Sequence, residues 1–220
     1  MDRIQFRTED GLLLEGELRL PDGPAVASAV LCHPHPRHGG SKDHPLLWTI
    51  RNDLAGRGFA VLVFNFRGVM GSDGEYGGGK AEVADVRAAV GVVRDEVDGP
   101  TLVCGWSFGA YVALSTALGD DRISALALLG PPLGDAPIPL PDMPGRAELK
   151  AFDRPVLLVA GEADQFCPLP ELRILGRKLT RATVRTVSDA DHFFWRQERE
   201  TAQIVGDFAE EALQREGRNQ

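Results

Sequence analysis

One serine stands in a setting that could make it a nucleophile. Ser107 is at the centre of a Gly-Trp-Ser-Phe-Gly segment at 105–109, which follows an apolar run and precedes a helical pattern. A turn from a buried strand into a helix would strain the serine backbone and expose the hydroxyl. The first N–H groups of the helix would face the place where an oxyanion forms. The alternative is an ordinary strand-to-helix turn, because glycine and serine are common.

A nucleophilic serine needs a neighbouring base near neutral pH. His192 is the only histidine that follows Ser107, and it comes directly after an alternating, strand-like segment at 183–187. A loop at the end of a strand can present a base to the edge of a sheet. We therefore expect His192 to be the general base, and the competing interpretation is a histidine in a surface loop.

The base needs an acid to orient its ring. Asp164 lies four residues beyond the apolar run at 156–160 and is our choice. Glu162 lies closer to the end of that run and is the main competitor. Asp189 and Asp191 are also candidates, but they are too close in sequence to the histidine to reach its far nitrogen. An aspartate in such a place is often only a turn former.

The elements that must position these residues follow from the apolar patterns. Alternation within residues 11–20 predicts a half-exposed strand, paired in a hairpin with residues 2–8. Continuous apolar runs predict strands covered on both faces, as in a parallel sheet, at 27–32, 59–64, 101–104, 125–129 and 156–160. Apolar spacings of three and four predict helices at 45–56, 80–97, 108–118, 169–179 and 197–214.

Strands and helices alternate along the chain, which indicates βαβ units. We therefore expect an α/β protein with a mostly parallel, twisted sheet, helices on both faces and an antiparallel N-terminal hairpin. One domain over residues 1–220 accounts for the whole pattern. The segment 130–155 holds seven of the 15 prolines and has no clear period. It is too long for an ordinary connection, so we expect a functional loop or a minimal cap there.

Composition excludes several classes of protein. The chain has 220 residues, 43% apolar and 25% charged, which is typical of a globular protein with a real core. The net charge of −8 argues against a nucleic-acid partner. No apolar stretch approaches the roughly 20 residues of a membrane span.

The cysteines and the N-terminus bear on the compartment. The chain has three cysteines, Cys32, Cys104 and Cys167, with no Cys-x-x-Cys spacing. Free, reduced thiols are the simple interpretation. The first residues lack the apolar core of a signal peptide. We expect a cytoplasmic protein.

Several motifs are spread over residues 30–195. They are His33-Pro34-His35-Pro36 with Gly39-Gly40, Phe64-Asn65-Phe66-Arg67-Gly68-Val69, the segment 105–109, Asp164 and His192. Together they resemble the α/β-hydrolase superfamily, and more narrowly the small bacterial serine hydrolases and esterases related to dienelactone hydrolases. The resemblance implies the α/β-hydrolase fold, a Ser-Asp-His triad and an esterase-like reaction.

Two features depart from the family. Dienelactone hydrolases proper use a cysteine nucleophile, whereas this chain has Ser107. The family's Arg-Gly-Val segment usually continues with Gly-x-Ser, but here Met70 intervenes. This loop could line the site, so we expect its shape to differ from that of the family.

The resemblance also implies two oxyanion donors. One is the backbone N–H of Phe108, the residue after the nucleophile. The other comes from the loop after the strand at 27–32, where Pro34 and Pro36 have no N–H to donate. The family pattern places this donor at His35.

Two other signals are set aside. His33, His35, His38 and His44 fall within twelve residues, as in some zinc sites, but two prolines stiffen their spacing. A structured oxyanion loop is the better account, and we expect no metal. Residues 74–81 nearly match a phosphate-binding loop, Gly-x4-Gly-Lys-[Ser/Thr], but end in alanine and start about ten residues after the strand. We interpret them as a rim loop.

We therefore expect a serine hydrolase that cleaves a carboxylic ester or thioester through an acyl-enzyme, without cofactor or metal. Its substrate would be a small molecule, and it would act as a monomer or homodimer. A non-catalytic binding or scaffold protein on the same fold is the alternative, but such a protein does not need all three triad residues. A peptidase-type acyl hydrolase is a further alternative.

Overall fold

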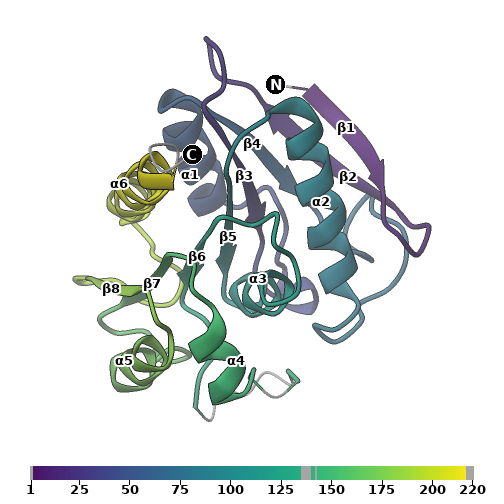
Figure 1. Cartoon of the computed structure of the whole chain (residues 1–220). Coiled ribbons are helices and arrows are strands. Elements are labelled where there is room, and N and C mark those ends of the chain that lie inside the picture. The colour runs from purple at the N-terminus through teal and green to yellow at the C-terminus, as the bar shows by residue number, and fades with distance from the viewer. Residues whose placement is uncertain (1, 135–139, 142, 217–220) are drawn as a thin grey trace.

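The computed structural model describes residues 2–134, 140–141 and 143–216, and it is built on an eight-stranded sheet (Figure 1). The strands lie in the order β1-β2-β4-β3-β5-β6-β7-β8. β1 and β2 form an antiparallel hairpin, β2 pairs antiparallel with β4, and the remaining pairs are parallel. The expected mostly parallel sheet with an antiparallel start is confirmed.

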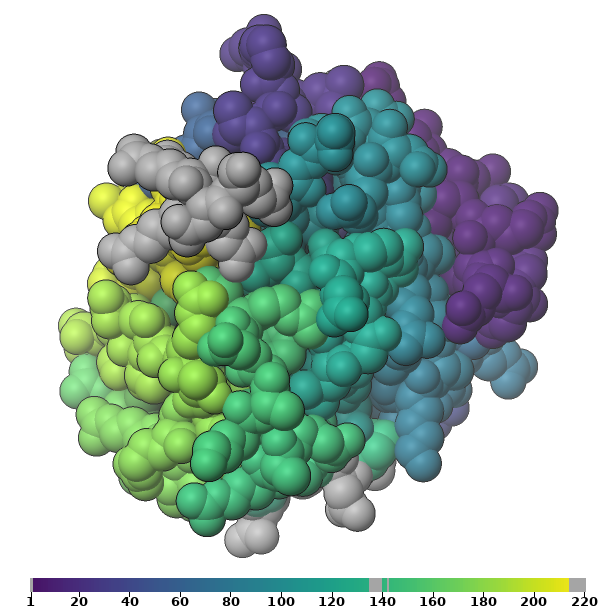
Figure 2. Space-filling model, in the orientation of Figure 1, coloured from purple at the N-terminus to yellow at the C-terminus, as the bar shows by residue number. Residues whose placement is uncertain are grey.

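The strands have the bounds β1 Asp2–Arg7, β2 Leu13–Arg19, β3 Ala27–Cys32, β4 Phe59–Phe64, β5 Thr101–Trp106, β6 Ala125–Leu129, β7 Val156–Gly161 and β8 Ala182–Val187. Every residue of β3 to β7 is buried, because both faces of these strands are covered. The two outer elements, the hairpin and β8, form opposite margins of the molecule (Figure 2).

The helices are α1 Pro45–Gly56, α2 Glu82–Glu96, α3 Phe108–Ala117, α4 Arg146–Ala151, α5 Leu169–Lys178 and α6 Glu198–Glu216, with a 3-10 turn at Pro36–His38. α1 and α6 lie together and pack on one face of the sheet, while α2 to α5 pack on the other (Figure 1). Helices on both faces were expected. Within the described part of the chain, every helix falls short of the length and apolar character that a membrane crossing requires.

The proline-rich segment at 130–155 contains the short helix α4. Leu149 of this helix is buried in the core, and the helix packs near α5. Residues 135–139 and 142, which belong to the same segment, lie outside the described residues. The described part therefore shows one small helical turn docked on the body of the fold.

A buried ion pair ties the loop after β4 to α2. The Asp85 side chain has no exposed surface, and it accepts hydrogen bonds from the backbone N–H, Nε and Nη2 of Arg67 at 2.7–2.9 Å. Arg67 also pairs with Asp10, in the turn between β1 and β2. The guanidinium of Arg67 thereby joins its own loop to the turn between β1 and β2 and to α2.

We predict that Asp85→Ala lowers the free energy of unfolding by about 3 kcal/mol, because it leaves a largely buried guanidinium with only one carboxylate partner. Urea denaturation would measure the loss. The control is Glu9→Ala, since Glu9 is exposed and lies 3.9 Å from Arg87. That change should cost less than about 0.5 kcal/mol. Equal effects of the two variants would contradict the prediction.

Candidate active site

Ser107 lies at the junction of β5 and α3, in a backbone conformation that few residues adopt. Its φ is 55° and its ψ is −118°, and its N–H donates to the carbonyl of Leu129 at 2.8 Å. A Cβ at Gly105 would overlap the carbonyl of Gly109, and a Cβ at Gly109 would overlap the carbonyl of Cys32. Glycine is therefore required on both sides of the serine. The turn stores strain at a place where the side chain is held above the strand ends.

Three side chains from separate loops form a chain of hydrogen bonds. Oγ of Ser107 lies 2.9 Å from Nε2 of His192, and Nδ1 of His192 lies 2.9 Å from both carboxylate oxygens of Asp164. All three residues are buried. The Asp164 carboxylate also accepts the N–H groups of Phe166 and Cys167, each at 2.9 Å. An ionised carboxylate satisfied in this way selects the imidazole tautomer with the proton on Nδ1, which leaves Nε2 free to accept the serine proton.

The structure separates the four acidic candidates. Asp164 is the one whose carboxylate lies within hydrogen-bonding distance of the His192 imidazole. Glu162 and Asp189 are exposed, and Asp191 accepts the N–H of Phe193 at 2.8 Å in the turn that carries the histidine. That turn is fixed in addition by Trp106, whose Nε1 donates to the carbonyl of His192 at 3.0 Å.

Gly130 is a site residue that the sequence analysis missed. It follows β6 with a φ of +49°, and a Cβ placed there would lie 2.9 Å from Oδ2 of Asp164 and 3.1 Å from Nδ1 of His192. The glycine thus gives the acid and the base the space in which they meet. Its place directly after an apolar strand was the available signal.

The two expected oxyanion donors lie on neighbouring segments. The start of α3 approaches the end of β3 so closely that Gly109 abuts the carbonyls of Cys32 and His33. The rings of His35 and Phe108 are 5.2 Å apart. Among the residues that the structure describes, the backbone N–H groups of His35 and Phe108 have no acceptor. Both are therefore available to an added oxygen.

His33 holds the loop that carries His35. Its Nδ1 donates to the carbonyl of Pro34 at 2.6 Å, and its Nε2 accepts the N–H of Phe66 at 3.0 Å. Burial lowers the pKa of His33 to about 4, so the ring is neutral and can make both bonds. The loop after β3 is thereby fastened to the loop after β4.

A cavity of about 470 Å³ opens above Ser107. Its lining is largely aromatic or imidazole, and consists of Pro34, His35, His38, Trp106, Ser107, Phe166, His192 and Phe193. Phe193 is 41% exposed and the nearby Trp195 is 55% exposed. No described residue of the segment 130–155 lines this cavity. An apolar group could therefore enter it from solvent.

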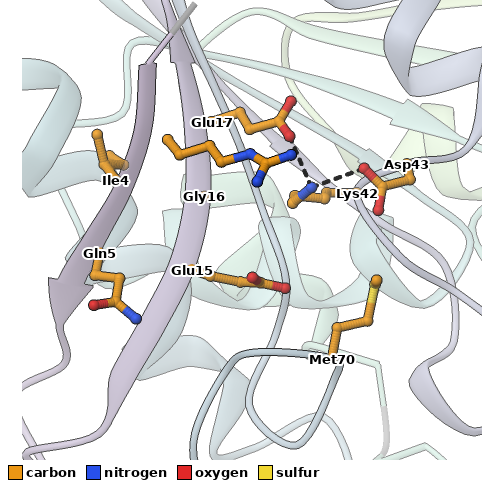
Figure 3. A pocket seen from close by; sticks show the side chains of 9 residues that line it. Ile4, Gln5, Glu15, Gly16, Glu17, Lys42, Asp43 and Met70 are labelled. Carbon is orange, nitrogen blue, oxygen red and sulfur yellow. Dashed lines mark hydrogen bonds and ion pairs between the residues drawn. The ribbon is translucent and has the colours of Figure 1, made fainter.

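A larger cavity, of about 590 Å³, lies on the outer hairpin (Figure 3). Lys42 pairs there with Glu17 at 3.0 Å and with Asp43 at 2.7 Å, and Figure 3 shows these side chains turned toward one another. Met70, 71% exposed, belongs to this wall. The sequence left open that the loop of Met70 lines the site; Met70 itself lies at this second cavity and not at the cavity of Ser107.

The histidine cluster and the glycine-rich loop have internal partners. His44 caps α1 through Nδ1, which accepts the N–H of Leu46 at 3.2 Å. Within the described ranges, no three His, Cys, Asp or Glu side chains are grouped to hold a metal ion. The N–H groups of Gly77 and Gly79, in the loop that resembles a phosphate-binding loop, donate to the carboxylate of Glu82. The three cysteines are free and buried.

Comparison with known proteins identifies the family and agrees with the fold. Residues 27–215 match the family described as Alpha/beta hydrolase domain. An uncharacterized protein of Rickettsia prowazekii is 25% identical over 225 residues, which cover 94% of this chain and 88% of that protein. Two solved structures are also similar, with matches that cover nearly all of both chains. An α/β serine hydrolase homologue of Coxiella burnetii is 27% identical, with a TM-score of 0.81 and coverage of 94% and 96%. An α/β serine hydrolase without a lid from Xanthomonas campestris is 26% identical, with a TM-score of 0.82 and coverage of 96% and 94%.

We predict that Gly130→Ala slows the covalent labelling of Ser107 by a fluorophosphonate about tenfold to a hundredfold, because the new methyl group must displace Asp164 or His192. The matched control is Gly134→Ala. Gly134 has a similar φ of +62°, but a Cβ there would meet its nearest atom only at 3.7 Å. The control should keep the wild-type labelling rate, and a loss of the same size in both variants would show that backbone strain alone is responsible.

Proposed function

This chain belongs to the α/β-hydrolase family, and we propose that it is a serine hydrolase that cleaves carboxylic esters or thioesters through an acyl-enzyme. The observation that carries the proposal is the continuous chain of hydrogen bonds from Ser107 through His192 to Asp164. A binding or scaffold protein gains nothing from a strained serine aligned on a base. The proposed roles are Ser107 as nucleophile, His192 as general base and Asp164 as the acid that orients it.

In the proposed acylation step, Oγ of Ser107 attacks the carbonyl carbon and its proton passes to Nε2 of His192. The carbonyl oxygen becomes an oxyanion, which the backbone N–H groups of Phe108 and His35 stabilise. Asp164 stabilises the imidazolium that forms. His192 then gives the proton to the departing alkoxide or thiolate, and the acyl group remains on Ser107.

Deacylation repeats these steps with water. His192 takes a proton from the attacking water, and the second tetrahedral intermediate uses the same two N–H groups. When that intermediate collapses, His192 returns the proton to Oγ of Ser107 and the acid is released. Every proton and electron pair is accounted for by substrate, water and three side chains, so the proposal includes no cofactor or metal.

The lining of the cavity bears on the substrate. The rings of Phe166, Phe193 and Trp106 lie around His192, at centroid distances of 4.8, 5.6 and 6.2 Å from its ring. These surfaces favour apolar or aromatic groups next to the reacting carbonyl. The cavity opens to solvent, and the similar serine hydrolase of Xanthomonas campestris has no lid. A panel of p-nitrophenyl esters and thioesters of increasing acyl length would define the preference.

We predict that Ser107→Ala abolishes both hydrolysis and fluorophosphonate labelling while the protein stays folded. Loss of a triad serine typically lowers kcat by several orders of magnitude, about 10⁶-fold in a well-studied protease. The control is the exposed serine in Ser188→Ala, which should change neither readout. Turnover above about a tenth of the wild-type rate in Ser107→Ala would exclude Ser107 as the nucleophile.

We predict that Asp164→Asn lowers kcat by about 10⁴-fold, because the amide no longer selects the tautomer with the proton on Nδ1. Glu162→Gln, Asp189→Asn and Asp191→Asn, assayed beside it, should stay within a few fold of wild type. A large loss in one of these three variants, with Asp164→Asn near normal, would reassign the acid and leave Ser107 and His192 unaffected.

A further inference from the structure

The glycine-rich loop carries a tyrosine that the proposed reaction does not use. The hydroxyl of Tyr76 lies 3.1 Å from Nε2 of His35. The Tyr76 ring packs against the rings of His35 and Phe108, at centroid distances of 4.9 and 5.7 Å. Tyr76 therefore contacts both residues whose backbone N–H groups are the proposed oxyanion donors.

The direction of the bond follows from the other nitrogen of the His35 ring. Nδ1 of His35 accepts the backbone N–H of Arg37 at 3.1 Å, so this nitrogen carries no proton. The neutral ring then has its proton on Nε2 and donates it to the Tyr76 hydroxyl oxygen. Burial, together with the charges of His38 and Arg37, lowers the pKa of His35 to about 4. Both bonds therefore persist at neutral pH.

The fixed ring in turn fixes the local backbone. His35 caps the 3-10 turn at Pro36–His38, and its carbonyl accepts the N–H groups of His38 and Gly40 at 3.0 and 3.1 Å. The carbonyl and both ring nitrogens of His35 are thus engaged, while its backbone N–H has no acceptor among the described residues. These bonds hold the ring and the carbonyl of His35, which adjoin the peptide that carries this N–H.

Other residues hold the loop that carries Tyr76. Glu82 is fully buried, and its carboxylate accepts the N–H of Gly77 at 2.7 Å and that of Gly79 at 2.8 Å. The backbone of Tyr76 also lies close to Gly68, since a Cβ at Gly68 would be only 3.1 Å from the backbone nitrogen of Tyr76. The guanidinium of Arg37 covers the ring at 4.7 Å. The loop therefore offers His35 a fixed hydroxyl and not a mobile one.

We infer that Tyr76 is a positioning residue for the reaction: its hydroxyl holds the His35 ring, and through it the His35 backbone N–H, in the orientation that receives the oxyanion. This inference rests on the proposed serine hydrolase function. Tyr76 acts through His35 and does not bond the reacting atoms. Its contribution should therefore appear in the transition state and not in the binding of substrate.

The test is Tyr76→Phe, which keeps the ring contacts and removes only the hydroxyl. We expect kcat on a p-nitrophenyl ester to fall about threefold to tenfold, the worth of one hydrogen bond, while KM stays within twofold. The inhibition constant of a trifluoromethyl ketone, which forms an oxyanion on Ser107, should rise by the same factor. The control is Thr180→Val, which removes a hydroxyl bonded to the carbonyl of Lys150 in the connection before β8. It should change neither quantity.

A double-mutant cycle tests the route through His35. Asn at position 35 can still accept the N–H of Arg37 as a capping residue, but it is too short to reach Tyr76. We expect His35→Asn, Tyr76→Phe and the double variant to lose similar amounts of kcat. Additive losses, a KM effect without a kcat effect, or an unchanged inhibition constant would each overturn the inference. A wild-type protein that neither hydrolyses esters nor takes the fluorophosphonate label would instead refute the proposed function.

Discussion

The rest of the site depends on the close approach of two backbone segments, the start of α3 and the end of β3. Gly109 permits it, because any Cβ there would overlap the carbonyl of Cys32. The approach puts the first N–H of α3 beside the loop that follows β3, and so brings together the segments of the two proposed oxyanion donors, Phe108 and His35. It also leaves Ser107 at a positive φ. Such strain persists only where the surroundings over-determine the conformation, and the packed sheet and helix do so here.

Burial keeps the two histidines of the loop after β3 in their neutral form. His33 and His35 are both kept neutral by desolvation, and each uses one nitrogen as donor and the other as acceptor. A protonated ring would lose its acceptor nitrogen and with it a bond to a backbone N–H. Because both side chains are buried, each of these bonds is also stronger than it would be in water. Two of the four histidines that suggest a metal site in the sequence, His33 and His35, hold the loop after β3 through these bonds.

The sequence was sufficient for the elements and for the main residues of the candidate site. Apolar runs located β3 and β4, and the helical pattern located α1, because burial on both faces leaves an unambiguous signal. The Gly-Trp-Ser-Phe-Gly segment between a strand and a helix, the single histidine after it and the loop after the run at 156–160 selected Ser107, His192 and Asp164, and the structure places these side chains within hydrogen-bonding distance. Gly130 and Tyr76 were not predictable in the same way. Gly130 directly follows an apolar strand, but its role and that of Tyr76 come from neighbours 34 and 41 residues away in the chain, Asp164 and His35, which no local pattern identifies.

Backbone N–H groups gather at two places, the glycine-rich loop at 74–81 and the start of α3, and the two places differ in whether a side chain of the described residues accepts them. Both gather backbone N–H groups whose geometry suits an anion. In the loop, the carboxylate of Glu82 occupies that geometry, so the loop is closed to a phosphate and serves as a support. At α3, the N–H of Phe108 has no acceptor among the described residues, and it lies beside Ser107, the proposed nucleophile. In the loop the fold supplies the anion itself, whereas at α3 we propose that the oxygen of a substrate takes that place.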